Sequence, residues 1–251
     1  MTKAMGRDEL PISWRHSDVV AERLVTDARE RVVTGTWLNH WSIQRARADE
    51  LRRFEFIGID GTLLQWLLTA NGQRTGRSSA DLVIPRIIAR DPSAPIALIG
   101  AAPGVAQEAM RRNPAWNVVY TCDGFEELRG LRGDYSRLVD SGARIVVLGL
   151  GTPLQEEVAL EVAAQVDAGL VLTGGGWIDQ LAAKEAYFPP IVHTLRVGWL
   201  WRLAHEPRRL GRRYTVDAVS AVLQRREFHT LLKTIAAQVG TLGWRGRDAH
   251  E

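Results

Sequence analysis

The chain has 251 residues, of which 45% are hydrophobic, and its formal net charge is +3. This length and composition allow a sizeable buried core and exclude a disordered chain. The single cysteine, Cys122, excludes an intramolecular disulfide. The N-terminal segment has no apolar core like that of a signal peptide, and no run approaches the roughly 20 apolar residues of a membrane-spanning helix. We therefore expect a cytoplasmic protein that does not span the bilayer.

Positive charge is concentrated in one segment near the C-terminus. Between residues 196 and 213, one acid, Glu206, stands against six arginines: Arg196, Arg202, Arg208, Arg209, Arg212 and Arg213. Such a block indicates a phosphate-rich ligand or a membrane surface as partner. Nucleic acid is the competing partner, but no recognised nucleic-acid-binding module accompanies the basic segment. We therefore expect no nucleic acid.

Short apolar runs alternate along the chain with helical stretches. The predicted strands are residues 54–59, 96–99, 118–121, 144–148 and 170–173. The predicted helices between them are residues 103–112, 124–141 and 153–166. Continuous apolar runs are typical of strands that are covered on both faces. The alternation predicts an α/β fold with a Rossmann-like, mostly parallel sheet flanked by helices.

The composition changes near Pro189 and Pro190. Beyond this point the chain is rich in arginine and tryptophan, and helical periodicity continues. We interpret residues 1–190 as an α/β catalytic core and residues 191–251 as a C-terminal helical appendage. The appendage is expected to complete the active site and to contact the membrane.

The first polar turn after a predicted strand contains Asp60 and Gly61. Ligands of open α/β sheets gather at the carboxyl ends of the strands, so Asp60 is expected to face a cleft. A carboxylate in such a cleft can act as a general base that removes a proton from a substrate hydroxyl, and Asp60 is the best-placed carboxylate for this role. The alternative is an N-cap of the predicted helix over residues 62–70, because Asp is a favoured capping residue.

Two further turns are rich in glycine. Gly100 follows the strand at 96–99, and Gly151 follows the strand at 144–148 and precedes Gln155 and Glu156. Glycine permits close approach of a phosphate to the backbone at a helix start. Plain strand-to-helix turns are the alternative, and Glu156 would also suit the helix dipole.

The last glycine turn and the basic segment complete the candidate site. Gly175 lies in a run of three glycines, which favours close ligand approach, and Asp179 follows it as a hydrogen-bond acceptor. Arg202, Arg209 and Arg212 are spaced so that helical turns could present them to one cleft, where guanidinium groups bind diphosphate. The alternative is a solvated basic helix whose tryptophans pack on the core.

Five motifs occur in one order along the chain: IDGTLL, IGAAPGVAQEA, LGLGTPLQEE, GGGWIDQLA followed by YFPP, and GWLWRLAHEPRRLGRRY. Together they resemble the WecG/TagA/CpsF family, also called glycosyltransferase family 26. The similarity runs from about Asn39 to Tyr214 and covers most of the chain.

The resemblance implies an inverting glycosyltransferase that needs no metal and no cofactor. Such an enzyme moves a sugar from a UDP-sugar to a polyprenyl-diphosphate-linked saccharide at the inner face of the membrane. The products of the family serve teichoic acid linkage units, enterobacterial antigen or exopolysaccharide. A homo-oligomer is compatible with the resemblance, and the donor sugar stays open.

Several residue roles are implied by this resemblance. Asp60 matches the proposed catalytic base, and Gln155 matches an active-site glutamine. Asn39 matches an active-site asparagine, although it follows Trp37 and Leu38 here where the family usually has Thr and Pro. Arg77 resembles an arginine that precedes the Asp-Leu pair of the family.

The remaining implied roles concern the donor nucleotide. Asp179 is expected near the uracil, and Arg202, Arg209 and Arg212 are expected at the diphosphate. The family's Gly-Tyr-Phe turn is Asp-Gly-Phe here, ending at Phe125, which leaves the aromatic partner of the uracil unassigned.

Two other classes of function compete with sugar transfer. A nucleotide-cofactor oxidoreductase needs a glycine fingerprint in its first strand–turn–helix unit, and the turn at Asp60 lacks it. A non-catalytic subunit of a polysaccharide-assembly complex does not account for polar residues at several strand ends.

Overall fold

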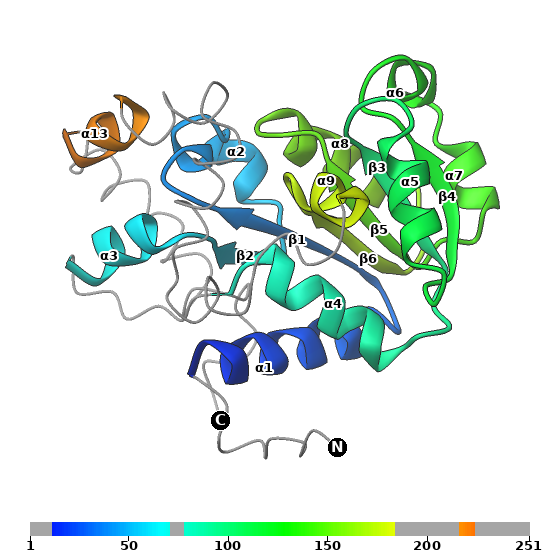
Figure 1. The fold of residues 1–251 in the computed structure, drawn as a ribbon, viewed down its shortest axis with the longest axis horizontal. Coiled ribbons are helices and arrows are strands. Elements are labelled where there is room, and N and C mark those ends of the chain that lie inside the picture. Colours follow the sequence, from blue (N-terminus) through cyan, green and yellow to red (C-terminus); the bar gives the residue numbers. More distant parts are fainter. Residues whose placement is uncertain (1–11, 71–77, 184–215, 224–251) are drawn as a thin grey trace.

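The computed structural model describes residues 12–70, 78–183 and 216–223 (Figure 1). Six strands form one sheet in the order β2-β1-β6-β5-β3-β4, and every pairing is parallel. The strands are β1 (Val32–Leu38), β2 (Phe56–Ile59), β3 (Ile96–Gly100), β4 (Val118–Cys122), β5 (Ile145–Gly149) and β6 (Gly169–Thr173). The predicted Rossmann-like α/β fold is confirmed.

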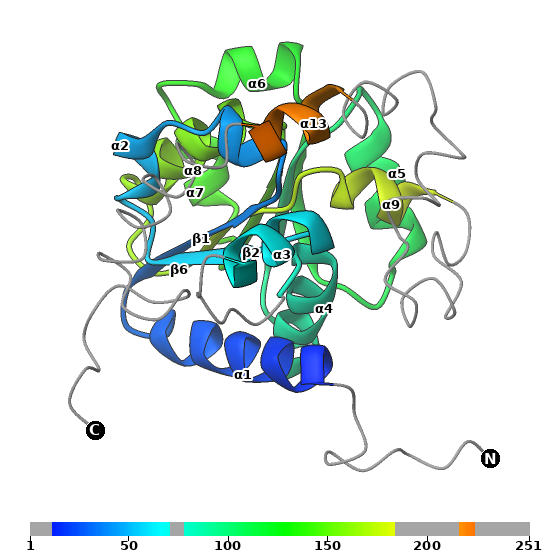
Figure 2. The same cartoon turned by 90° about the vertical axis from the view of Figure 1, so that its left-hand side faces the viewer.

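Helices cover both faces of the sheet, as Figures 1 and 2 show. One layer packs on the buried cluster that contains Val33 and Leu172, and it consists of α1 (Ile12–Asp27), α4 (Ala80–Arg90), α5 (Val105–Arg112) and α9 (Trp177–Ala182). The other layer packs on the cluster that contains Leu38 and Val171, and it consists of α2 (Ala48–Leu51), α3 (Thr62–Ala70), α6 (Glu126–Leu131), α7 (Ser136–Asp140) and α8 (Leu154–Ala163).

The apolar runs of the strands supply both clusters. In β5, Ile145 and Val147 belong to the cluster under α1 and α4, whereas Val146 and Leu148 belong to the cluster under α8. Successive side chains of a strand point to opposite faces of the sheet, so a strand between two helical layers buries both sets of side chains and is usually apolar along its length. The resulting continuous apolar runs explain why these strands could be predicted from the sequence.

The strand missing from the prediction is β1, although it lies inside the sheet between β2 and β6. Its sequence, VVTGTWL, carries Thr34, Gly35 and Thr36 in the middle, which interrupts the apolar run. Thr34 accepts a hydrogen bond from the backbone N–H of Glu55 at 3.1 Å, and Thr36 is fully buried. Buried hydroxyls with hydrogen-bond partners are tolerated in a sheet, so the polar pattern concealed a central strand.

One predicted helix proved to be two. The stretch 124–141 forms α6 and α7, which are separated by a turn containing Gly133 at φ 90°. The first helix ends at its C-cap residue, Arg132, whose backbone is extended, and Gly133 then supplies the left-handed residue of the turn from Leu131 to Asp134, a conformation that glycine adopts without steric strain.

The only described element beyond residue 183 is α13 (Val216–Leu223), which belongs to the predicted appendage. Its Asp217 pairs with Arg45 at 3.3 Å, and its backbone carbonyl accepts from Gln44 Nε2 at 3.1 Å. The α13 helix is therefore fixed to the short η2 turn (Ser42–Gln44) that follows β1. The rest of the appendage and its predicted boundary at residue 190 lie outside the described residues.

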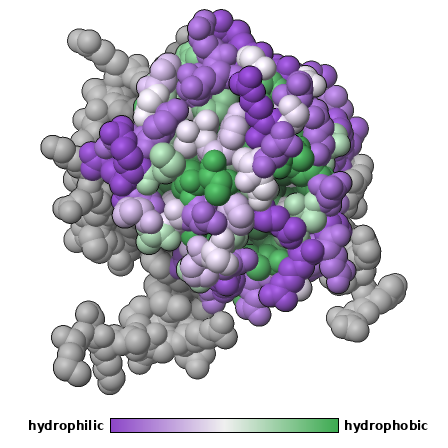
Figure 3. Space-filling model, turned by 90° about the vertical axis from the view of Figure 1, so that its right-hand side faces the viewer, coloured by the Kyte–Doolittle hydropathy of each residue, from purple (hydrophilic) through white to green (hydrophobic). Residues whose placement is uncertain are grey.

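The edge of the sheet at β4 faces the viewer in Figure 3, where hydrophilic residues dominate and apolar residues form separate patches. The strand is short, with five residues, and Val119 on it is 42% exposed. A short edge strand in hydrophilic surroundings offers little template for pairing with another chain. Separately, no helix among residues 12–70, 78–183 and 216–223 is both long and apolar enough to cross a membrane.

A tight contact between β3 and β5 makes Gly100 a test of the fold. A Cβ added to Gly100 would lie 2.4 Å from the carbonyl oxygen of Gly149, and the φ of Gly100 is +131°. We expect Gly100→Ala to lower the free energy of unfolding by about 3 kcal/mol or more, because backbone atoms must move apart. Urea denaturation of the purified protein measures this change.

Gly104→Ala is the matched control. Gly104 also has positive φ, at +81°, but an added Cβ would meet nothing within 4 Å. Its substitution should therefore lose only about 1 kcal/mol, the cost of the left-handed backbone. Equal losses in the two variants would show that the contact with Gly149 is not what restricts residue 100.

Candidate active site

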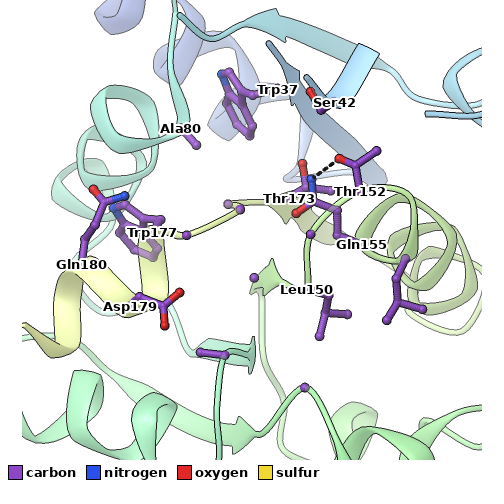
Figure 4. Close-up of a pocket in the computed structure, with 18 of the residues that line it drawn as sticks. Trp37, Ser42, Ala80, Leu150, Thr152, Gln155, Thr173, Trp177, Asp179 and Gln180 are labelled. Carbon is purple, nitrogen blue, oxygen red and sulfur yellow. Dashed lines mark hydrogen bonds between the residues drawn. The ribbon is translucent and has the colours of Figure 1, made fainter. Parts of the chain in front are cut away.

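A pocket of about 720 Å³ lies at the carboxyl ends of the strands (Figure 4). Residues that follow all six strands line it, including Asn39 after β1, Asp60 after β2, Ala101 after β3 and Phe125 after β4. The turns after β5 and β6 supply the two glycine-rich walls. The chain runs from β1 and from β3 toward opposite edges of the sheet, and ligands of open α/β sheets bind at such reversal points.

The pocket brings together six of the residues predicted from the sequence. They are Asn39, Asp60, Gly151, Gln155, Gly175 and Asp179. Gly100 does not line the pocket. Arg77, Arg202, Arg209 and Arg212 lie outside the described residues.

Asn39 is held by the turn that follows β1. Its Oδ1 accepts hydrogen bonds from the N–H groups of Trp41 and Ser42, each at 3.0 Å, and Ser42 Oγ accepts from the N–H of Asn39 at 2.8 Å. This reciprocal arrangement is an Asx turn, which fixes the side chain at the pocket wall. The turn occupies the amide oxygen, so the amide nitrogen is the group that Asn39 can offer to a ligand.

Asp60 stands directly after β2 and before α3. Its N–H donates to the carbonyl of Leu38 at 2.7 Å, which extends the pairing with β1 by one residue and fixes the backbone at the pocket. Helix α3 begins at Thr62, so the capping position falls to Gly61 and not to Asp60. The alternative reading of Asp60 as an N-cap is therefore wrong, and its half-buried side chain lines the pocket.

Asp179 lies in the first turn of α9 and faces the pocket from the side opposite Thr152 and Gln155 (Figure 4). Asp81, in the first turn of α4, also lines the pocket and had not been assigned to the site. With Asp60, these residues give the wall three carboxylates. The described lining residues include no lysine or arginine, so an anionic ligand needs positive charge from outside this set.

The glycines of the pocket differ in their physical role. Gly151 and Gly175 have φ of +76° and +55°, and an added Cβ would meet nothing within 4 Å at either position. Both glycines permit a left-handed backbone in their turns, and without side chains they leave the pocket wall open to a ligand. Gly100 was predicted to approach a ligand, but it approaches the backbone of Gly149 instead.

Ala101 has φ 62°, a left-handed conformation that costs free energy for a residue with a Cβ. Its N–H donates to Gly149 at 3.0 Å, and its carbonyl accepts from the N–H of Gly124 at 2.9 Å. The strained residue therefore ties together the turns that follow β3, β4 and β5. Phe125, next to Gly124, is 54% exposed where it lines the pocket.

A buried polar cluster supports the wall beside Gln155. Glu156 is fully buried, and its Oε1 accepts hydrogen bonds from Thr36 Oγ1 at 3.1 Å and Thr152 Oγ1 at 3.2 Å. Thr36 and Thr173 hydroxyls lie 2.8 Å apart. Burial raises the pKa of Glu156, although its hydrogen bonds act in the opposite direction. Sequence reasoning missed Thr36 and Thr173 because a lone threonine within a strand carries no signal.

The described part of the chain contains no group of three or more His, Cys, Asp and Glu side chains that could hold a metal ion. Six strand-end turns around one acidic, glycine-rich pocket define an α/β enzyme with a ligand site at the carboxyl edge of its sheet. Comparison with known families identifies the class of enzyme more closely. Residues 12–232 match the model of the glycosyl transferase WecG/TagA/CpsF family, and the chain belongs to that family.

A relative with a recorded activity is similar over a large part of the chain. The UDP-Gal:alpha-D-GlcNAc-diphosphoundecaprenol beta-1,4-galactosyltransferase of Shigella boydii is 28% identical over 187 residues, covering 68% of this chain and 77% of that protein. Family membership decides between the three predicted classes of function. The protein is a glycosyltransferase, and the oxidoreductase and non-catalytic alternatives are set aside.

Proposed function

We propose that the enzyme transfers a sugar from a UDP-sugar to a polyprenyl-diphosphate-linked saccharide, with inversion at the anomeric carbon, in the synthesis of a bacterial surface polysaccharide. The observation that carries the proposal is the convergence of Asn39, Asp60, Gln155 and Asp179 on one pocket. Its volume of about 720 Å³ suits a nucleotide-sugar, since small-molecule sites usually span roughly 300–1,000 Å³. The Shigella relative acts on a GlcNAc-diphosphoundecaprenol with UDP-Gal, which makes UDP-galactose the first donor to test.

Asp60 is the proposed general base. Its carboxylate would remove the proton from the acceptor hydroxyl as that oxygen attacks the anomeric carbon from the face opposite UDP. One displacement breaks the bond to the diphosphate and forms the new glycosidic bond, which inverts the anomeric carbon. Asp179, across the pocket from Gln155 (Figure 4), would accept a hydrogen bond from the uracil N–H.

The donor diphosphate needs cationic partners that the described wall does not contain. We assign them to Arg202, Arg209 and Arg212, whose guanidinium groups would offset the charge that grows on the leaving UDP. With these residues in place the reaction would need neither a metal ion nor a cofactor.

The proposal is tested by a transfer assay on the full chain. Purified enzyme, UDP-galactose and a GlcNAc-diphosphate lipid should yield a lipid-linked disaccharide, with unchanged rate after addition of EDTA. UDP-glucose, UDP-GlcNAc and UDP-glucuronic acid are the alternative donors. No transfer from any UDP-sugar to any diphosphate-linked acceptor would refute the proposed reaction, and loss of activity with EDTA would refute metal independence alone.

Asp60→Asn should abolish most transfer while UDP still binds. Removal of a general base typically lowers the rate about 10²- to 10⁴-fold, so kcat should fall within this range. The dissociation constant of UDP, measured by calorimetry, should change little. Asp49→Asn is the control, because Asp49 is an exposed acid, 68% accessible, outside the pocket. Turnover in Asp60→Asn equal to that of the control would remove Asp60 from the base role.

We further propose that the enzyme works at the inner face of the membrane, where its lipid-linked acceptor resides. The basic segment from Arg196 to Arg213 would attract anionic lipid at roughly 1 kcal/mol per nearby basic residue. The enzyme should therefore float with vesicles that contain phosphatidylglycerol at low salt. It should leave them at about 0.5 M NaCl, because salt at this concentration shortens the Debye length to a few Å and screens the charges. Indifference to vesicles at both salt concentrations would contradict this placement.

A further inference from the structure

Three hydrogen-bond donors converge on a single oxygen of Glu156. Gln155 Nε2 donates to Oε1 at 2.9 Å, and the hydroxyls of Thr36 and Thr152 donate to it at 3.1 and 3.2 Å. Gln155 Nε2 also donates to Thr152 Oγ1 at 3.3 Å. All four residues are at most 9% exposed, so the network lies in surroundings of low dielectric constant, where such bonds are strong.

This network determines which end of the Gln155 amide faces Glu156. Each hydroxyl has one proton, and the protons of Thr36 and Thr152 both go to Glu156 Oε1. An amide turned the other way would set its own oxygen against Oε1, and two acceptors at that separation repel. The amide nitrogen is therefore committed to the protein.

The amide oxygen of Gln155 is left for a ligand. Gln155 lines the pocket and is only 4% exposed, and its Oε1 is buried without a hydrogen-bond partner among the described residues. A buried carbonyl without a donor costs free energy, which a ligand hydroxyl can recover. Diphosphate oxygens are acceptors and cannot supply that donor. A sugar hydroxyl can, and Gln155 lies across the pocket from Asp179, the residue proposed above to bind the uracil (Figure 4).

We propose that Glu156 is a positioning residue that locks the Gln155 amide, so that the amide oxygen receives a hydroxyl of the bound sugar; this rests on the proposed function. Glu156 itself does not touch the substrate. Its neighbour Glu157 offers a contrast, because it lies outside the pocket lining and pairs with Arg132. Two adjacent acids of α8 thus have different roles.

The test uses five variants of the full chain: Gln155→Met, Glu156→Met, Glu156→Gln, the double variant with Met at both positions, and Glu157→Met as the matched control. Thermal unfolding and circular dichroism first establish which variants fold. Glu156→Gln keeps an acceptor oxygen within the network, so it preserves a test even where Glu156→Met does not fold. Initial rates are then measured with UDP-galactose and a GlcNAc-diphosphate lipid.

Glu156→Met should lower kcat/KM roughly 10- to 100-fold, the usual effect of a misplaced group in an active site. Glu156→Gln should recover activity to within about 3-fold of the unmodified enzyme, and Glu157→Met should leave it unchanged. In the Gln155→Met background, the change at Glu156 should add less than about 3-fold, because the two residues act as one unit. Full additivity of the two losses would overturn the proposal, since Glu156 would then act independently of Gln155.

A second readout does not depend on catalysis. The side-chain NH₂ protons of Gln155, observed by NMR, should exchange slowly with water in the unmodified protein and in Glu156→Gln, and quickly in Glu156→Met. Fast exchange in the unmodified protein would overturn the locked amide even if transfer is observed. Slow exchange in a protein that transfers no UDP-sugar would instead show that the lock is real and that the proposed reaction is wrong.

Discussion

Parallel pairing of all six strands is the constraint on which the site depends, because it directs every strand-end turn to one edge of the sheet. Backbone hydrogen bonds then tie these turns to one another. Asp60 donates to Leu38 at 2.7 Å, Ala101 to Gly149 at 3.0 Å, and Gly174 to Leu148 at 2.7 Å. The pocket walls are thus extensions of the sheet, and the position of each functional side chain follows from strand register.

The sequence was sufficient to predict strands that are apolar on both faces, and it failed where a buried strand carries polar residues. Runs such as residues 145–148 predict a covered strand because apolar residues follow one another without polar residues between them. The β1 strand was missed because the buried hydroxyl of Thr36 has its hydrogen-bonding partners in Thr173 and Glu156, residues more than 100 positions away. A local sequence pattern does not show that a buried hydroxyl forms a hydrogen bond with a residue far away in the chain.

The same distinction holds within the candidate site. Asp60 and Asp179 could be placed from their positions after strands or glycine turns, and both line the pocket. The different positions of Glu156 and Glu157 could not be predicted, because both are acids in the first turn of α8 and both suit its dipole. About 100° of helical rotation separates neighbouring residues, which turns one side chain into the protein and the other toward Arg132.

The acidic pocket wall and the basic segment from Arg196 to Arg213 carry opposite charges. A wall with Asp60, Asp81 and Asp179 is acidic, so the described lining residues supply no positive charge to offset the charge of a diphosphate. The proposed arginine partners, Arg202, Arg209 and Arg212, belong to the basic segment that would also contact anionic lipid. In this proposal, the same positive charges serve both the donor and the membrane. Donor binding and recruitment to the acceptor are then coupled, because each stabilises an arrangement in which the arginines are held at the carboxyl edge of the sheet.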